Sequence, residues 1–299
     1  MTDQAMWDFF WEVRLQKMEG LGKREAILTA SRLIRAAGGG RPLRLFEPGC
    51  GEAQIIGALV EGHSQECSRT ESVGIDYLHS SIERCRKDYP GMRFIEGDFT
   101  DPALVDGLGQ FDMLLLVNAL HEVFSLTFSE DLGEVDVPRA KERVAQAFAL
   151  SVAHVRPGGY IVLFDGLETP GDITRTLNVR FLTRQAREHF DIFVRDYHPF
   201  QIRPRLTRDP FVVELSWRDF TRYLTKSIFL GKHLWPHEKF ESYQYYNEDE
   251  FRAMFARENV EIIELRKLTE NYEKWAEVVE IEEDFPVEHI IIVGKKGHR

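Results

Sequence analysis

The sequence has little cysteine. Its 299 residues include three, Cys50, Cys67 and Cys85, and no two of them have CxxC spacing. An odd number of cysteines without that spacing argues against a disulfide framework and against a structural zinc site. Because unpaired thiols suit a reducing compartment, we expect a cytoplasmic protein with no metal site.

Long hydrophobic runs are also missing. The longest apolar stretches, such as residues 113–117, have five residues, whereas a membrane-spanning helix needs roughly 20. Asp3, Asp8 and Glu12 stand where a signal peptide would need an uncharged apolar segment. The sequence therefore predicts no membrane partner.

Basic charge is scarce as well. Lys and Arg number 38 against 49 Asp and Glu, which gives a net charge of −11. Such a field repels a polyanion, and this argues against a nucleic-acid partner. The rest of the composition, 43% hydrophobic and 29% charged, is typical of a globular protein.

One segment departs from this acidic average. Residues 170–246 carry 13 basic and 9 acidic side chains and 15 of the 35 aromatic residues, whereas residues 1–169 carry 17 basic and 26 acidic side chains. We therefore predict three parts. These are a helical cap at 1–40, a core made of 41–169 and 247–299, and an inserted substrate-binding or lid subdomain at 170–246.

Hydrophobic periodicity predicts strands that alternate with helices. Strands are expected at residues 43–46, 72–75, 92–95, 111–118, 160–164, 260–265 and 289–293. Helices are expected at 23–37, 53–61, 79–88, 139–154 and 248–258, and an earlier one on the stripe Trp7, Phe10, Trp11, Leu15 and Met18. This alternation predicts an α/β fold in which helices cover both faces of a parallel sheet, with ligands bound at the carboxyl ends of its strands.

A glycine turn, EPGCGEA at residues 47–53, follows the first strand. Two glycines one residue apart let the backbone approach a ligand, and the helix beyond offers free N–H groups. A dinucleotide loop would have a third glycine where this chain has Gln54, so an NAD-dependent dehydrogenase is a weaker hypothesis. An ordinary strand-to-helix turn is the alternative without a ligand.

Polar and aromatic residues follow the next three strands. Asp76 and Tyr77 come at the end of the second strand, and Asp98 and Phe99 follow the third. A carboxylate after the second strand suits a ribose diol, and a carboxylate with an aromatic neighbour suits an aminated flat base. Asn118 ends the fourth strand.

In this order the motifs resemble the class I S-adenosylmethionine-dependent methyltransferases. The matching residues are the glycine motif Glu47-x-Gly49-x-Gly51-x-Ala53, the acidic Asp76, the pair Asp98-Phe99, the fourth-strand motif at 111–118 and the Arg-Pro-Gly-Gly turn at 156–159. The resemblance spans roughly residues 43–169 and 247–296. It implies a Rossmann-like, seven-stranded, mostly parallel sheet with an inserted subdomain after strand five.

The resemblance also implies S-adenosyl-L-methionine as the cofactor and gives residues their roles. The turn of Gly49, Cys50 and Gly51 would pass under the methionine portion with Glu47 near its ammonium group, Asp76 and Tyr77 would lie at the ribose, Asp98 and Phe99 at the adenine, and Asn118 beside them. Ala53 stands where glycine is commoner in the family.

His121, Glu122 and Asp165 are the candidate catalytic residues, because they follow strands four and five where an acceptor would meet the methyl group. A histidine near neutral pKa can take a proton from a hydroxyl or an amine. The alternative is that these residues cap helices and loops. A metal site needs three or four ligands at known spacing, which His121-Glu122 lacks.

We therefore predict methyl transfer to an O or N atom of a small-molecule acceptor. Two alternatives stay open: aminocarboxypropyl transfer or cyclisation of the same sulfonium, and a catalytically silent interaction protein. Within 170–246, arginines such as Arg180, Arg184 and Arg187 at apparent helical spacing suit an acidic substrate group. Alternatively they pair with the acidic core while the aromatics pack inside the subdomain. A homodimer is left open.

Overall fold

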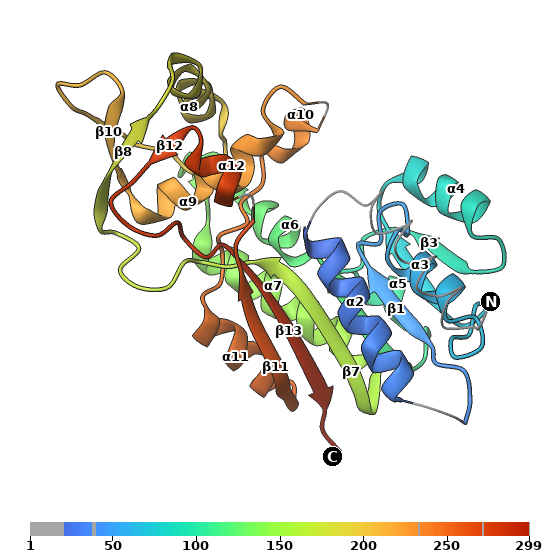
Figure 1. Cartoon of the computed structure of the whole chain (residues 1–299). Coiled ribbons are helices and arrows are strands. Elements are labelled where there is room, and N and C mark those ends of the chain that lie inside the picture. The colour runs from blue at the N-terminus through green and yellow to red at the C-terminus, as the bar shows by residue number, and fades with distance from the viewer. Residues whose placement is uncertain (1–20, 38–39, 233, 271, 299) are drawn as a thin grey trace, which may run out of the picture.

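The computed structural model describes residues 21–37, 40–232, 234–270 and 272–298 (Figure 1). The aromatic stripe predicted to form an N-terminal helix lies outside these residues. Helix α2 (Leu21–Ala36) is the part of the expected helical cap that the structure describes, and it confirms the helix predicted at 23–37.

Seven strands form the central sheet, as the sequence predicts. Their order is β11 (Val260–Leu268), β13 (His289–Lys296), β7 (Val155–Gly166), β4 (Phe111–Val117), β1 (Leu45–Pro48), β2 (Val73–Asp76) and β3 (Arg93–Glu96). Strand β13 pairs antiparallel with both of its neighbours, and the other pairs in this sheet are parallel. The carboxyl ends of β1, β2, β4 and β7 therefore meet at one edge of the sheet.

Helices cover both faces of this sheet (Figure 1). Met113 and Leu115 of β4 belong to a core shared with α2, α3 (Ile56–Gly62) and α4 (His79–Asp88). Leu114 and Leu116 belong to a second core, shared with α5 (Pro102–Val105), α6 (Leu120–Ser125), α7 (Val137–Ala153) and α11 (Glu248–Arg257). Because strand side chains alternate between faces, the apolar run at residues 113–117 of β4 can serve both cores.

Helix α3 begins later than the sequence suggests. It was expected to start at residue 53, but Ala53 has a φ of 55° and the helix begins at Ile56. A left-handed residue cannot belong to a right-handed helix, so the glycine turn extends further along the chain. The N–H of Ile56 donates to a carboxylate oxygen of Glu47 at 2.9 Å.

A second sheet lies beside the core. Its order is β12 (Val279–Glu280), β8 (Thr176–Phe181), β10 (Val212–Ser216) and β9 (Arg205–Leu206). Helices α8 (Arg184–Asp196), α9 (Trp217–Lys226), α10 (Trp235–Glu238) and α12 (Tyr272–Ala276) accompany it, with a short 3₁₀ turn, η1 (Ser227–Phe229). We call this second sheet, its helices and the loops within residues 170–246 the inserted unit.

The inserted unit draws on two parts of the chain. Most of it falls within the predicted subdomain, 170–246, but β12 comes from the connection between β11 and β13. Strands β11 and β13 thus pair antiparallel in the central sheet, yet the segment that joins them adds a strand to the second sheet. The division of the chain into a core and an insertion remains a prediction. The pairing of β12 with β8 joins a segment of the predicted core range to the predicted insertion.

Aromatic side chains fill the centre of the inserted unit. The ring of Tyr223 lies 5.2 Å from that of Phe190 and 5.4 Å from that of Phe193, centroid to centroid. These rings belong to the same continuous core as Leu114 and Leu116 of the central sheet. The two sheets therefore share apolar packing.

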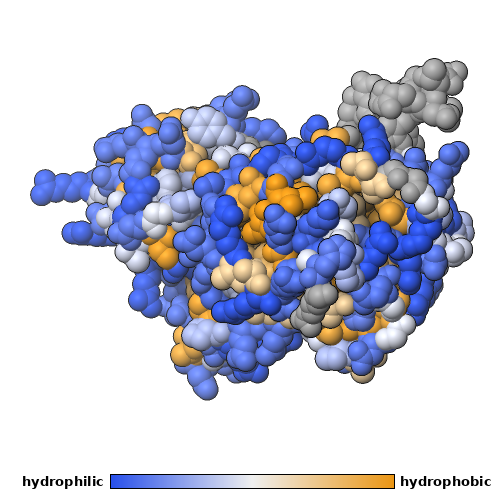
Figure 2. All heavy atoms as spheres, turned by 90° about the horizontal axis from the view of Figure 1, so that it is seen from below, coloured by the Kyte–Doolittle hydropathy of each residue, from blue (hydrophilic) through white to orange (hydrophobic). Residues whose placement is uncertain are grey.

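The surface seen from below is largely hydrophilic, with hydrophobic residues gathered in patches between charged ones (Figure 2). Within the described parts of the chain, no helix combines the length and the apolar character needed to cross a membrane.

Candidate functional site

The turn after β1 has a special backbone conformation. Gly49 and Gly51 have φ values of 70° and 51°, in a region that glycine enters freely. A Cβ added to Gly49 would lie 3.0 Å from the Cβ of Ala119. The turn and the loop after β4 therefore approach each other so closely that a larger residue at 49 would force them apart.

Asp76, the last residue of β2, fixes this turn. Its Oδ2 accepts a hydrogen bond from the N–H of Gly51 at 2.8 Å, and its Oδ1 accepts one from the N–H of Leu78 at 2.9 Å. The thiol of Cys85 donates to the carbonyl of Gly51 at 3.2 Å. The carboxylate predicted for the ribose thus also shapes the glycine turn, while Tyr77 beside it is exposed.

Glu47 is a buried acid beneath the turn. Its side chain is 2% exposed, and burial raises its pKa to about 8 although the hydrogen bond from Ile56 opposes this rise. A buried carboxylate becomes more favourable when a positive group approaches it. The position of Glu47 therefore suits an ammonium group of a ligand.

Asp98 and Phe99 lie on the loop after β3. Oδ1 of Asp98 accepts hydrogen bonds from the N–H and the hydroxyl of Thr100, at 2.8 and 2.7 Å. The Cε1 atom of Phe99 lies 3.8 Å from a Cβ built on Gly49. The structure therefore brings the aromatic ring against the glycine turn and leaves Asp98 exposed beside it.

The chain leaves β4 through Asn118, which has a φ of 54°. Its N–H donates to the carbonyl of Phe164 in β7 at 2.8 Å. Helix α6 starts two residues later. This sharp turn puts the predicted residues His121 and Glu122 in the first turn of a helix at the sheet edge.

Asp165 joins β7 to that helix. Its Oδ1 lies 2.7 Å from Nδ1 of His121, and its Oδ2 accepts from the backbone N–H groups of Leu120 and His121, at 3.0 and 3.3 Å. His121 and Asp165 are 2% and 1% exposed. The structure thus brings these two candidate residues together as a buried pair, in which Asp165 holds the ring in one orientation.

Two groups at this point have shifted pKa values. Burial of the His121 ring favours its neutral form, but the carboxylates of Asp165 and Glu241 together outweigh this and raise the pKa of His121 to about 9. Burial raises the pKa of Glu122 to about 7, against the opposing charge of His121. At neutral pH the imidazole of His121 therefore carries a proton, and the carboxyl group of Glu122 is only partly deprotonated.

A cavity of about 480 Å³ connects these parts. From the core it is lined by the glycine turn, by Glu47 and Asn118, and by His121 and Glu122. The predicted residues Asp76, Tyr77, Asp98, Phe99 and Asp165 are not among its lining residues. The cavity thus joins the predicted methionine end of the cofactor site to the predicted acceptor end.

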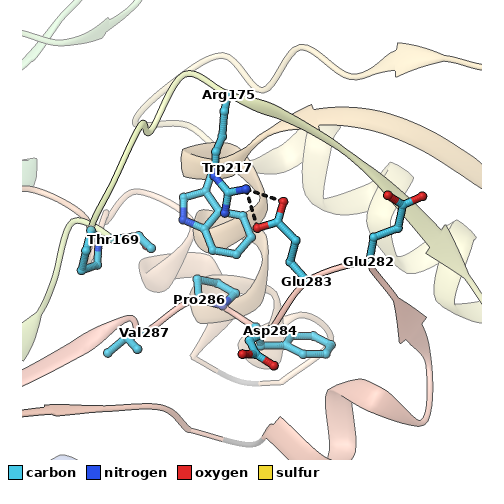
Figure 3. Close-up of a pocket in the computed structure, with 10 residues that line it drawn as sticks. Thr169, Arg175, Trp217, Glu282, Glu283, Asp284, Pro286 and Val287 are labelled. Carbon is cyan, nitrogen blue, oxygen red and sulfur yellow. Dashed lines mark hydrogen bonds and ion pairs between the residues drawn. The ribbon is translucent and has the colours of Figure 1, made fainter.

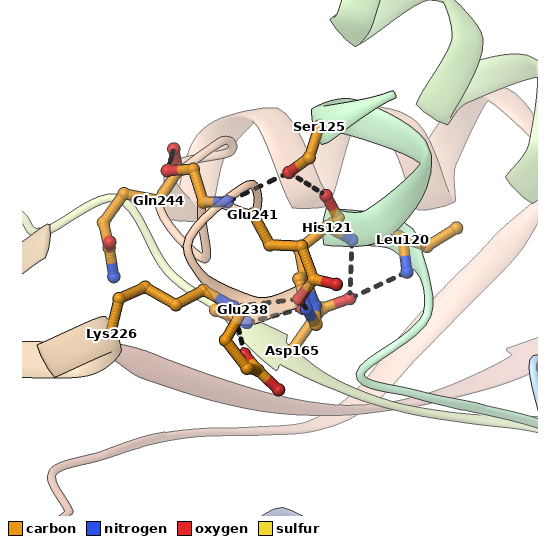
Figure 4. Close-up of polar contacts among 10 residues, drawn as sticks. Leu120, His121, Ser125, Asp165, Lys226, Glu238, Glu241 and Gln244 are labelled. Carbon is orange, nitrogen blue, oxygen red and sulfur yellow. Dashed lines mark hydrogen bonds and ion pairs between the residues drawn. The ribbon is translucent and has the colours of Figure 1, made fainter. Parts of the chain in front are cut away.

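The inserted unit supplies the rest of the lining, which the sequence did not predict. Leu234, Glu238, Glu241 and Tyr243 all line the cavity. Figure 4 shows Glu241 reaching His121 across the gap between the two units, and its Oε2 lies 3.5 Å from Nε2 of His121. Nothing in the spacing of the sequence indicated the carboxylates of Glu238 and Glu241.

The residues present fit S-adenosylmethionine. Gly49 keeps the turn close to the loop after β4, and Phe99 lies against it. Glu47 and Glu52 at the turn, with one cation, Lys23, among the same lining residues, give the cofactor end of the cavity an acidic character. Such a lining suits a ligand that carries an ammonium and a sulfonium.

A second hollow of about 690 Å³ lies where the core meets the inserted unit. Figure 3 shows Arg175 lying over the indole of Trp217 and bonded to Glu283. The guanidinium carbon of Arg175 is 4.0 Å from the ring centroid. With Arg175 and Glu283 already paired, the hollow offers less free charge to a ligand than the first cavity.

The arginines singled out in the sequence do not form one helical row. Arg180 lies on β8, whereas Arg184 and Arg187 lie on α8. Their partners are all in the inserted unit: Arg180 with Asp209, Arg184 with Glu188, and Arg187 with Asp191. The prediction of helical spacing was wrong for Arg180 because β8 ends between these positions.

The described residues hold no group of three or more His, Cys, Asp or Glu arranged to bind a metal ion.

Comparison with known protein families gives a match to part of the chain. Residues 46–163, somewhat less than half of the chain, match the family model described as a methyltransferase domain. No curated protein matches the sequence. The matched range holds the glycine turn, Asp76, Asp98 and His121, which the structure places at one edge of the sheet.

Solved structures show a distant likeness. An O-methyltransferase family protein from Burkholderia thailandensis is 10% identical, with a TM-score of 0.45, and the alignment covers 92% of this chain and 57% of that one. The 1,6-didemethyltoxoflavin-N1-methyltransferase of the same organism, solved with its substrate and S-adenosylhomocysteine, is 11% identical (TM-score 0.46; 99% and 87% covered). An amino pentose methyltransferase from Micromonospora echinaspora is 15% identical (TM-score 0.45; 96% and 96% covered).

The family match, the sheet order and the motifs at the strand ends agree. Residues 46–163 therefore form an S-adenosylmethionine-dependent methyltransferase domain of the class I, Rossmann-like type.

Proposed function

We propose that this enzyme methylates an O or N atom of a small molecule that binds between the glycine turn and the inserted unit. The observation that carries the proposal is the single cavity of about 480 Å³ that both Gly49 and His121 line. Methyl transfer is an in-line displacement, so the donor and the acceptor must share one enclosed space.

The cofactor end of the proposal uses the predicted residues. S-adenosylmethionine, when bound, supplies an electrophilic methyl group on a sulfonium. Glu47 would bind its ammonium group, Asp76 the ribose hydroxyls and Asp98 the adenine amine. Asp76 would do so while keeping its hydrogen bond from Gly51, so that one carboxylate both shapes the turn and binds the ligand.

At the acceptor end, Glu122 is the residue best suited to take a proton. Its pKa of about 7 leaves it partly deprotonated at neutral pH, which is where a general base works best. His121, with its higher pKa, would lose its proton less readily and would instead place a positive charge beside the acceptor. Asp165 would orient His121.

The inserted unit would close the acceptor end. Leu234 and Tyr243 add apolar surface to the lining, and Glu238 adds a carboxylate. A partly apolar wall with a few polar groups is the common form of a small-molecule site. The mixture also explains why we propose an organic acceptor in place of a polymer.

Calorimetric titration with S-adenosylmethionine and S-adenosylhomocysteine tests the cofactor end. We expect one site for each ligand, and we expect Asp88→Asn, on the exposed side of α4, to leave both affinities unchanged. Binding of neither ligand would contradict the proposal and favour a silent interaction protein.

Product analysis tests the reaction. Incubation with phenols and amines should yield S-adenosylhomocysteine and an acceptor heavier by one CH₂ group. Methylthioadenosine in its place would show aminocarboxypropyl transfer or cyclisation. His121→Ala is expected to slow turnover more than it weakens cofactor binding, because the ring lies at the acceptor end of the cavity.

A further inference from the structure

A lysine is fully buried in the inserted unit. Lys226, the last residue of α9, is 0% exposed. Its ammonium group lies 2.7 Å from Oε2 of Glu238 and 3.0 Å from Oε2 of Glu241, and 3.7 Å from the ring centroid of Tyr243. A buried charge without partners is very unfavourable, so these contacts hold Glu238, Glu241 and Tyr243 in fixed places around the lysine.

Glu241 contacts two cations at once. The oxygen that accepts from Lys226 is also the one that lies 3.5 Å from Nε2 of His121. Although burial opposes ionisation, the charges of Lys226 and His121 hold the pKa of Glu241 below its ordinary value. Glu241 is therefore a carboxylate that joins the inserted unit to the core.

His121 is consequently held on three sides. Asp165 contacts Nδ1, Glu241 faces Nε2, and the ring of Tyr243 stands edge-on to the imidazole with centroids 4.2 Å apart (Figure 4). Asp165 belongs to strand β7, while Glu241 and Tyr243 come from the segment after α10. The ring position therefore depends on both units.

We propose that Glu241 is a positioning residue of the methyl-transfer site, which completes from the inserted unit a clamp of two carboxylates around the imidazole of His121. This inference rests on the proposed function. With the clamp closed, each ring nitrogen faces a carboxylate, so His121 is a fixed, charged group at the acceptor end of the cavity. The position of the inserted unit on the core and the protonation state of His121 therefore depend on each other.

The alternative is that Glu241 serves only to balance Lys226. Glu238 provides the matched comparison, because it bonds the same ammonium group and lines the same cavity. Glu238 forms an ion pair with Lys226, whereas Glu241 forms ion pairs with both Lys226 and His121. Replacing either acid removes one partner of the lysine, and replacing Glu241 alone opens the clamp.

The test is a nuclear magnetic resonance titration of the His121 ring in the full-length wild type, in Glu241→Gln and in Glu238→Gln. The charged groups around the ring are Glu122 on its own helix, Asp165 on β7, Lys226 on α9, and Glu238 and Glu241 of the inserted unit. An opposite charge at this range raises a histidine pKa by about one pH unit or more. We expect Glu241→Gln to lower the His121 pKa by about that amount and Glu238→Gln to lower it clearly less.

Equal shifts in the two variants, or no shift in Glu241→Gln, would overturn the inference. Glu241→Asp should restore part of the shift, because it keeps the charge on a shorter side chain. Circular dichroism identifies any variant that fails to fold, and wild-type His121 titrating below pH 7 would by itself contradict the clamp.

Titration of the same samples with S-adenosylhomocysteine tests the proposed function separately from the role of Glu241. If the ligand binds but His121 does not respond to Glu241, the inference fails and the proposed function stands. If His121 responds but no ligand binds, the proposed function fails and Glu241 is left with a structural role. Once an acceptor that becomes methylated is known, Glu241→Gln should lower kcat by roughly tenfold while the affinity for S-adenosylhomocysteine changes little, because a misplaced His121 affects the acceptor end of the cavity and not the cofactor end.

Discussion

The backbone N–H of Gly51 donates to Oδ2 of Asp76 at 2.8 Å, and this bond fixes the glycine turn after β1 to the end of β2. The two motifs are therefore one unit in the folded protein. A carboxylate that shapes the turn cannot be removed without also changing the turn, so the choice of substitution decides what an experiment at this position measures.

Asp76→Asn and Asp98→Ala should each weaken S-adenosylmethionine binding by roughly 10- to 100-fold, because each removes a hydrogen bond to a charged group worth about 1.5–3 kcal/mol. Asn at 76 keeps only one of the two oxygens that accept hydrogen bonds from the backbone N–H groups of Gly51 and Leu78. Calorimetry gives the affinities, with Asp88→Asn as the control. Unchanged binding in both variants would remove these residues from the site.

Glu47→Gln should stabilise the ligand-free protein at alkaline pH. The folded-state pKa of Glu47, about 8, lies above its ordinary value of 4.5, so the folded protein keeps a proton that the unfolded chain has lost. Stability contributed by that proton is full below pH 4.5 and is lost as the pH rises to 8, with an upper limit of roughly 4–5 kcal/mol.

The measurement for Glu47→Gln is thermal unfolding at pH 5 and pH 8. The stability gap between variant and wild type should be small at pH 5 and larger at pH 8. The same variant should bind S-adenosylmethionine more weakly, since it has lost the predicted ammonium partner. A gap that does not grow with pH would contradict the burial of an ionisable group at this position.

The rate of methyl transfer should rise with pH around 7. The pKa of Glu122 is raised to about 7 by burial, and a base must be deprotonated to accept a proton. Activity should therefore increase through pH 7 and level off above it. Release of S-adenosylhomocysteine from pH 5.5 to 8.5 measures this, and Glu122→Gln should remove the rise. A profile in the variant that keeps the wild-type shape would assign the base elsewhere.

Asp112→Ala should lower stability and leave the site intact. This buried carboxylate accepts from both Nη atoms of Arg41 and from the N–H of Arg44, and it also pairs with Arg156. Loss of a partner for half-exposed guanidinium groups should cost about 1–3 kcal/mol of unfolding free energy.

Asp112 lies at the start of β4, at the opposite end of the strand from Asn118, so the affinity for S-adenosylhomocysteine should not change. Urea denaturation and calorimetry check the two halves of this prediction, with exposed Asp106→Ala as the control. Weaker ligand binding in a folded Asp112→Ala protein would show that the two ends of the strand are coupled.

Local patterns in the sequence predicted the central sheet and the ligand motifs. Short apolar runs identified the strands, and the carboxyl end of each run identified the loop that carries Glu47, Asp76, Asp98 or His121. Each of these motifs lies within a few residues of the strand that precedes it, so periodicity and turn chemistry are enough to find it. The late start of α3 was missed because the left-handed conformation of Ala53 has no signal in an alanine.

The tertiary structure alone decided how the inserted unit meets the core. The sequence gives no sign that β12 pairs with β8, because strand pairing between distant segments depends on the whole chain path. Nor does it show that Glu241 would reach His121, or that a buried Lys226 would hold it there. Ion pairs between distant residues leave no periodic trace, since each partner alone looks like an ordinary surface charge. The sequence by itself therefore determined the class of enzyme and its cofactor motifs. Folding determined the charge states of His121 and Glu241, and it placed the inserted unit against the acceptor end of the cavity.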